Sequence, residues 1–162
     1  MSEKLVKILF HLDPTDWHGS LRESLWAEPV AGATPGAVYT LRNTPFYARG
    51  VSLMDIVRVT PGKDGAALEF AGVVDRSGHS TYMLLVPPIS AEFDNYWARL
   101  QALGCTFESA SQRTSLGERM LYAVDVPASS DIYAVYEVLE EGERQNIWLF
   151  QEGHAGHKLK SN

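Results

Sequence analysis

The stretch that decides the fold is Ser80–Ser109, STYMLLVPPISAEFDNYWARLQALGCTFES. It opens with a nearly continuous apolar run, typical of a central strand, which two prolines end. Apolar residues then recur at helical spacing as far as Gly104, a residue type that commonly follows a helix end. The pattern therefore predicts a strand over 80–86, a helix capped by Ser90, and a short strand from Cys105.

A similar order of elements follows. Arg119–Pro127 alternates like a strand, an apolar helical stripe follows a cap expected at Ser129 or Ser130, and Ile147–Gly153 reads as a closing strand. The whole order is β-α-β-β-α-β, which is the order of ferredoxin-like domains. We therefore expect a ferredoxin-like domain over residues 78–153, with two helices on a four-stranded antiparallel sheet.

The first half of the chain has short strands separated by turn residues. Strands are expected at Lys4–Leu12, Leu21–Val30, Ala37–Asn43, Asp55–Pro61 and Ala67–Asp75. Lys63-Asp64-Gly65 is typical of a hairpin turn between the last two. The spacing predicts a small, partly open β-barrel over residues 1–77 that covers the free face of the ferredoxin-like sheet. The fold class is therefore α+β, with 154–162 as a flexible tail.

Composition bounds the class of protein. The chain has 162 residues, of which 45% are hydrophobic, and no stretch approaches the roughly 20 apolar residues of a membrane span. The first residues lack a signal-peptide pattern, so a cytoplasmic location is expected. The single cysteine excludes an internal disulfide and a cysteine-based zinc cluster, and Cys105 reads as a buried small hydrophobe. No glycine-rich phosphate or dinucleotide loop is present, so no cofactor is expected.

The net charge of −6 is unevenly spread. Residues 90–152 carry eleven acids against four bases, and Glu137, Glu140 and Glu141 lie on the second predicted helix. Such a surface repels phosphate backbones, which disfavours a nucleic-acid partner. It would attract a basic protein, although an acidic helix face can also be merely solvated.

The motif SGHST, Ser77–Thr81, combines a histidine with three hydroxyls and a glycine. We interpret it as a structural or binding turn, with His79 and Ser80 as candidate binding residues. His79 could instead act as a base, with Glu23 or Asp55 as its acidic partner. Adjacent strand residues point to opposite faces, so Ser80 is not expected to be its nucleophile.

Two further segments hold candidate binding residues. In ESLWAEP, Trp26 is expected in the barrel core, with Glu23 near the rim. In the connection NTPFYARGVSLMD, Arg49 could hold an anionic ligand or pair with Asp55 or Glu69. The pair His154-x-x-His157 has no third ligand nearby, so no metal site is expected.

Five motifs, taken in order and spacing, resemble a family of small bacterial proteins catalogued as domain of unknown function 4265. These motifs are ESLWAEP, NTPFYARGVSLMD, SGHST, ALGC and AVDVP. The resemblance covers roughly residues 4–153 and implies a soluble, stand-alone bacterial protein. It implies no activity or catalytic residue.

We expect a non-enzymatic protein-binding module, of the immunity or antitoxin kind, that binds and blocks a basic partner. Two alternatives remain open. The first is a domain that senses a small ligand at the junction of barrel and sheet, near Arg49, Asp55 and His79. The second is a hydrolase that depends on His79. No membrane partner is expected.

Overall fold

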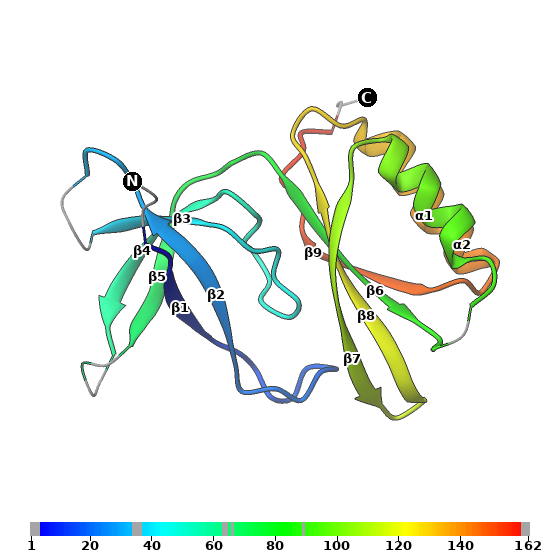
Figure 1. Ribbon diagram of the computed structural model, residues 1–162, viewed down its shortest axis with the longest axis horizontal. Helices are drawn as coiled ribbons and strands as arrows, with labels where there is room; N and C mark the ends of the chain where they lie inside the picture. Colours follow the sequence, from blue (N-terminus) through cyan, green and yellow to red (C-terminus); the bar gives the residue numbers. More distant parts are fainter. Residues whose placement is uncertain (1–3, 34–36, 63–64, 66, 89, 160–162) are drawn as a thin grey trace.

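A computed structural model describes residues 4–33, 37–62, 65, 67–88 and 90–159. Five strands pair in a ring, and four more form a sheet with both helices on the face turned away from the ring (Figure 1). The ring strands are β1 (Val6–His11), β2 (Arg22–Pro29), β3 (Val38–Leu41), β4 (Ile56–Pro61) and β5 (Leu68–Asp75). The sheet half comprises β6 (Ser80–Val86), α1 (Phe93–Ala102), β7 (Thr106–Thr114), β8 (Gly117–Val126), α2 (Ile132–Arg144) and β9 (Leu149–His154). The architecture is α+β, as predicted.

The ring strands pair antiparallel with their chain neighbours, and β1 also pairs in parallel with β5. That last pairing joins Ile8 to Leu68 and Leu9 to Glu69, so the sheet closes where the sequence predicted it to be partly open. Alternate side chains of each strand fill the interior of the ring, because every second residue of a strand points inward. The inward residues include Ile8, Phe10, Leu25 and Leu41. Lys63 and Asp64 of the predicted hairpin turn lie outside the described residues.

The four-stranded sheet has the order β7-β8-β6-β9, with antiparallel pairing throughout. β6 therefore has a neighbour on both sides, and burial of both its faces explains its nearly continuous apolar sequence. Tyr82 and Leu84 face the helices and join a core that includes Trp148 and Leu139. Met83 points to the other face of the sheet.

Both expected helix caps are wrong. The residue before α1 is Glu92, which makes no side-chain cap, and Ser90 lies outside the helix. α2 is capped by Asp131, whose carboxylate accepts hydrogen bonds from two backbone amides of the first turn. Ser129 precedes the cap, and the hydroxyl of Ser130 donates instead to a backbone carbonyl near the end of α1.

The connection between β3 and β4, residues 42–55, joins the ring to the sheet. The Glu108 carboxylate on β7 accepts hydrogen bonds from the Asn43 side chain (3.0 Å) and the Thr44 amide (2.7 Å). The hydroxyls of Ser52 and Thr81 lie 2.7 Å apart in a buried contact. Each half has its own hydrophobic cluster, and the contacts just described between the halves are polar. Within the described residues, neither helix is long and apolar enough to cross a membrane.

Candidate functional site

The SGHST turn lies where the chain passes from the ring to the sheet. Gly78 has a φ of +88°, a conformation that favours glycine, and a Cβ there would lie 3.1 Å from the Cβ of Ala128. The Ser77 amide donates to the Asp55 carboxylate (2.8 Å), and the Ser77 hydroxyl donates to the Leu53 carbonyl (2.8 Å). Ser77 therefore fastens the turn to the connection between β3 and β4.

Asp55 is a structural acid of this junction. Its side chain is 1% exposed and accepts hydrogen bonds from the amides of Ser52 (2.9 Å) and Ser77 (2.8 Å). The guanidinium of Arg76 lies 3.6 Å from it. A buried carboxylate is stable when backbone donors and a cation satisfy it in this way. The predicted pairing of Asp55 with Arg49 is therefore wrong.

His79 pairs with Asp125, and not with Glu23 or Asp55 as the hydrolase hypothesis required. Its Nδ1 lies 2.8 Å and 3.1 Å from the two carboxylate oxygens of Asp125, whose side chain is 3% exposed. Burial raises the pKa of Asp125, and the hydrogen bond with His79 acts against that rise. The pair orients the imidazole, but no side-chain hydroxyl among the described residues hydrogen-bonds to the His79 ring.

Ser80 belongs to a different pair. Its Oγ lies 2.6 Å from Nδ1 of His157, and Nε2 of His157 lies 2.8 Å from the Pro127 carbonyl. A carbonyl can only accept, so Nε2 donates to it, and Nδ1 accepts the Ser80 hydroxyl proton. The amides of Gly156 (2.9 Å) and His157 (3.2 Å) donate to the same Oγ. Ser80 is fully buried, so it anchors this segment and is not exposed as a nucleophile.

This anchoring bears on two expectations for the C-terminal residues. The segment 155–159, predicted as part of a flexible tail, is fixed to the sheet at Gly156 and His157. His154 ends β9, and its Nε2 lies 3.3 Å from Nη1 of Arg76. The two histidines thus have different partners. Among the described residues, no group of three or more histidine, cysteine, aspartate or glutamate side chains could hold a metal ion.

A pocket of about 290 Å³ adjoins Ser80 on the helix side of the sheet. The N-terminal half of α2, the edge strand β9 and the segment 155–159 form its walls. Its polar and aromatic lining comprises Ser80, Tyr82, Tyr133, Tyr136, Glu152 and His157. The sequence indicated Ser80 only, because no sequence motif connects it to the segments that carry the other five residues.

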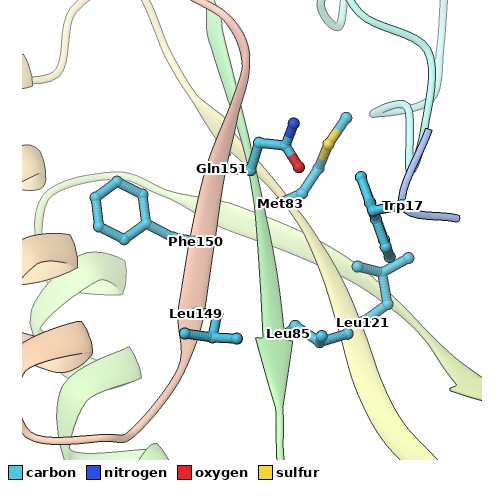
Figure 2. A pocket seen from close by; sticks show the side chains of 7 residues that line it. All are labelled: Trp17, Met83, Leu85, Leu121, Leu149, Phe150 and Gln151. Carbon is cyan, nitrogen blue, oxygen red and sulfur yellow. The ribbon is translucent and has the colours of Figure 1, made fainter. Parts of the chain in front are cut away.

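A second pocket, of about 210 Å³, lies on the other face of the sheet (Figure 2). Met83 of β6 and Leu121 of β8 form its floor, and Trp17 approaches from the loop after β1. Trp17 is 39% exposed and Leu149 is 52% exposed. This apolar pocket shows that the loops of the ring cover the free sheet face only in part.

The candidates in the ring are structural or exposed. Glu23 accepts hydrogen bonds from the amides of Phe46 (2.7 Å), Tyr47 (3.0 Å) and Ala48 (2.9 Å), which fixes the connection between β3 and β4. Trp26 is 42% exposed, and the prediction that it lies in the core is wrong.

Alternation explains the position of Trp26, because its neighbours Leu25 and Ala27 take the inward positions of β2. The ammonium of Lys7 lies 5.0 Å from the centroid of the indole ring.

Arg49 pairs with Asp16 at 3.1 Å. Its predicted pairing with Glu69 is also wrong, since Glu69 contacts His11 at 3.2 Å. Arg49, Asp55 and His79 thus each have a different partner.

The acidic candidates on α2 are partly paired. Glu141 contacts Arg99 of α1 at 2.8 Å, and this hydrogen bond lowers the pKa of Glu141. Glu140 lies 3.7 Å from Arg144, while Glu137 is exposed. The two helices are therefore linked at the surface by an Arg–Glu pair.

Cys105 is buried, as predicted. Burial raises the pKa of its thiol to about 12, and the charge of Asp125 adds to this effect. A thiol in this environment is unreactive near neutral pH.

Comparison with known proteins identifies the family. The model of the family described as Domain of unknown function (DUF4265) matches residues 23–150. The chain belongs to this family. A search of curated proteins finds no match.

Among solved structures, the chain is similar to a hypothetical protein from Neisseria gonorrhoeae. The two share 18% sequence identity with a TM-score of 0.71, over 98% of this chain and 99% of that one. At this identity the likeness concerns the fold alone, and the function of this DUF4265 member has to be argued from its own surface.

Proposed function

We propose that this DUF4265 member is a non-enzymatic protein-binding module that docks a basic partner on its two helices. The observation that carries the proposal is the distribution of charge. Residues 92–102 and 131–144 contain seven acidic residues and only two arginines, so the helical layer holds five of the six net negative charges of the chain. A concentrated field of one sign speeds association with a partner of the opposite sign.

The two arginines of this layer already have glutamate partners, Arg99 with Glu141 and Arg144 with Glu140. Neither Glu137 nor Glu143, both exposed, forms an ion pair within the described residues. Two tyrosines lie on the same helix, Tyr133 with 49% and Tyr136 with 42% of its surface exposed. Tyrosine is enriched at protein interfaces, where it contributes contact area at a small entropic cost. An acidic surface that includes tyrosines suits a basic protein.

Within this proposal, the partner is a basic protein that the module binds and blocks, as immunity proteins and antitoxins do. We also interpret the five-stranded ring as a small β-barrel and the β7-β8-β6-β9 sheet with its helices as a ferredoxin-like domain. The same proposal includes a cytoplasmic location. It includes neither a nucleic-acid nor a membrane partner, because an acidic surface repels phosphate groups.

The test compares two variants of equal net charge as baits in a lysate of the native host. The first carries Glu137→Gln, Glu140→Gln and Glu143→Gln on α2. The matched control carries Glu28→Gln, Glu69→Gln and Glu118→Gln, away from the helices. We expect a basic protein to be captured by wild type and the control, and to be lost from the α2 variant. Equal capture by all three baits, or capture of chaperones only, would overturn the proposal.

A second candidate function is the sensing of a small ligand. The observation that favours it is the pocket of about 290 Å³ beside Ser80, which is of a size and polarity that suit a small molecule. A thermal-shift screen tests it, because any ligand that binds only the folded state raises the melting temperature. The candidate is rejected when no class of metabolite stabilises the protein.

A further inference from the structure

The pocket beside Ser80 has a defined arrangement of rings and one carboxylate. Tyr82 of β6 and Glu152 of β9 are register partners, so their side chains lie next to each other on the helix side of the sheet. Tyr136 reaches the same place from α2, with its ring centroid 6.5 Å from that of Tyr82. Phe150, the next β9 residue on this face, packs against both tyrosine rings.

Three polar groups of this pocket, the Glu152 carboxylate and the hydroxyls of Tyr82 and Tyr136, are available to a ligand. Within the described residues, no hydrogen bond or ion pair involves the Glu152 carboxylate or the hydroxyls of Tyr82 and Tyr136. Burial raises the pKa of Tyr82 to about 12, and the negative charge of Glu152 contributes. Tyr82 therefore keeps its hydroxyl proton at neutral pH.

No lysine, arginine or histidine side chain of the described residues forms an ion pair with this carboxylate. His157 is the basic residue of the lining, and its two ring nitrogens are engaged by Ser80 and the Pro127 carbonyl in the pattern of a neutral imidazole. The pocket thus offers a negative charge, the electron-rich faces of tyrosine rings and hydrogen-bond acceptors.

We propose that this pocket binds an organic cation, either a guanidinium or an alkylammonium group, between Glu152 and the rings of Tyr82 and Tyr136. A carboxylate forms strong, charge-assisted hydrogen bonds with such a group, and aromatic faces attract cations. The planar guanidinium matches both features, because it donates in its plane and stacks through its faces.

This inference goes beyond the proposed function, because the ligand need not be a protein. A free metabolite and an arginine or lysine side chain of a protein would offer the same cationic group. Tyr136 lies in the pocket wall, and the next residue, Glu137, belongs to the acidic helix surface proposed to dock a partner.

Isothermal titration calorimetry of the full chain tests the pocket with n-butylguanidinium and its neutral analogue n-butylurea. A second pair of probes is a five-residue peptide with one central arginine and the same peptide with citrulline. We expect each cation to bind at least about tenfold more tightly than its neutral analogue. Binding of n-butylguanidinium would identify a free cation as a sufficient ligand, and binding of the arginine peptide alone would assign the site to a protein side chain.

The Glu152→Gln variant is expected to weaken binding of the cations about tenfold or more, because the amide keeps the shape and removes the charge. Glu118→Gln, at an exposed position of β8 away from the helices, serves as the matched control and is expected to leave binding unchanged. Tyr136→Phe keeps the ring and is expected to retain most of the affinity, whereas Tyr136→Leu is expected to lose it.

The inference is overturned when neither cation binds, when the neutral analogues bind equally well, or when Glu152→Gln binds the cations as wild type does. Loss of the basic partner from the α2 charge variant together with normal cation binding would support both proposals. If the cations bind normally but no basic partner is captured, the proposed function is contradicted and the proposed cation site is retained.

Discussion

The hydroxyl of Ser80 lies 2.6 Å from Nδ1 of His157, although 77 positions separate the two residues in the chain. This contact fixes the end of the described chain to β6, an inner strand of the sheet. It also completes one wall of the pocket proposed to bind a cation. Ser80, a candidate binding residue in the sequence analysis, thus has a structural role.

Replacing Ser80 with alanine is expected to lower the free energy of unfolding by about 1–3 kcal/mol, because His157 and the two amides lose their shared partner. Urea denaturation measures the loss, and hydrogen exchange is expected to become faster at Gly156 and His157. Ser111→Ala, at an exposed position of β7, is the matched control. Unchanged exchange at both amides would contradict the anchoring role.

The pH dependence of stability reports on Asp125. Because the pKa of this acid is raised in the folded state, that state binds more protons than the unfolded chain above the unfolded pKa of 3.8. The stability that Asp125 contributes is therefore fully present below pH 3.8 and is lost as the pH rises through the folded pKa.

The variant Asp125→Asn isolates this effect, because asparagine cannot ionise. Wild type is expected to lose stability relative to the variant between about pH 4 and the folded pKa, with a slope of at most about 1.4 kcal/mol per pH unit. Urea unfolding at half-unit pH intervals measures the difference. If wild type instead gained stability relative to the variant over this range, the lowering of the Asp125 pKa by His79 would outweigh its raising by burial.

The two glutamates of ESLWAEP are expected to differ in their effect on stability. Glu23→Ala removes the acceptor of three backbone amides, which costs about 2–3 kcal/mol of unfolding free energy. Glu28→Ala removes only a surface pair with Arg42 at 3.4 Å, and a change below about 1 kcal/mol is expected. Chemical denaturation of both variants measures the contrast. Equal losses would show that the Glu23 contacts contribute little.

Replacing Gly142 of α2 with alanine is expected to lower the stability of the protein, which is the opposite of the usual effect at a helix glycine. Alanine normally stabilises a helix interior by about 1 kcal/mol relative to glycine. Here a Cβ would overlap the indole of Trp148, which packs against α2 and donates a hydrogen bond to the Leu139 carbonyl (2.9 Å).

Gly142→Ala is therefore expected to destabilise the protein by about 1–3 kcal/mol and to alter tryptophan fluorescence. The double variant Gly142→Ala, Trp148→Phe is the control, because the smaller ring is expected to relieve part of the overlap. A rise in stability on the single substitution would contradict the close contact.

The sequence was sufficient to predict the order of the strands and helices in the described part of the chain, because alternation and helical spacing are local patterns that tertiary contacts reinforce. It did not predict the helix caps, since Ser129, Ser130 and Asp131 all have capping side chains and the backbone geometry selects the last. Trp26 was assigned to the core by residue type, whereas the alternation around it places Leu25 and Ala27 inside.

The site was harder to predict, because its parts are distant in sequence. His157 stands in a segment rich in glycine and polar residues, a composition that favours a flexible tail, and only the sheet brings it to Ser80. Arg49 has several acids within reach along the chain, and the loop geometry selects Asp16. Pairings of this kind depend on the folded arrangement and leave no periodic signal in the sequence.

The separation of the hydrophobic clusters has a practical consequence. Among the described residues, no buried hydrophobic side chain belongs to both clusters, so a substitution deep inside the ring and one beneath the helices affect different sets of core residues. The energetic effects of two such substitutions should simply sum. An engineer could therefore redesign either interior while leaving the other untouched.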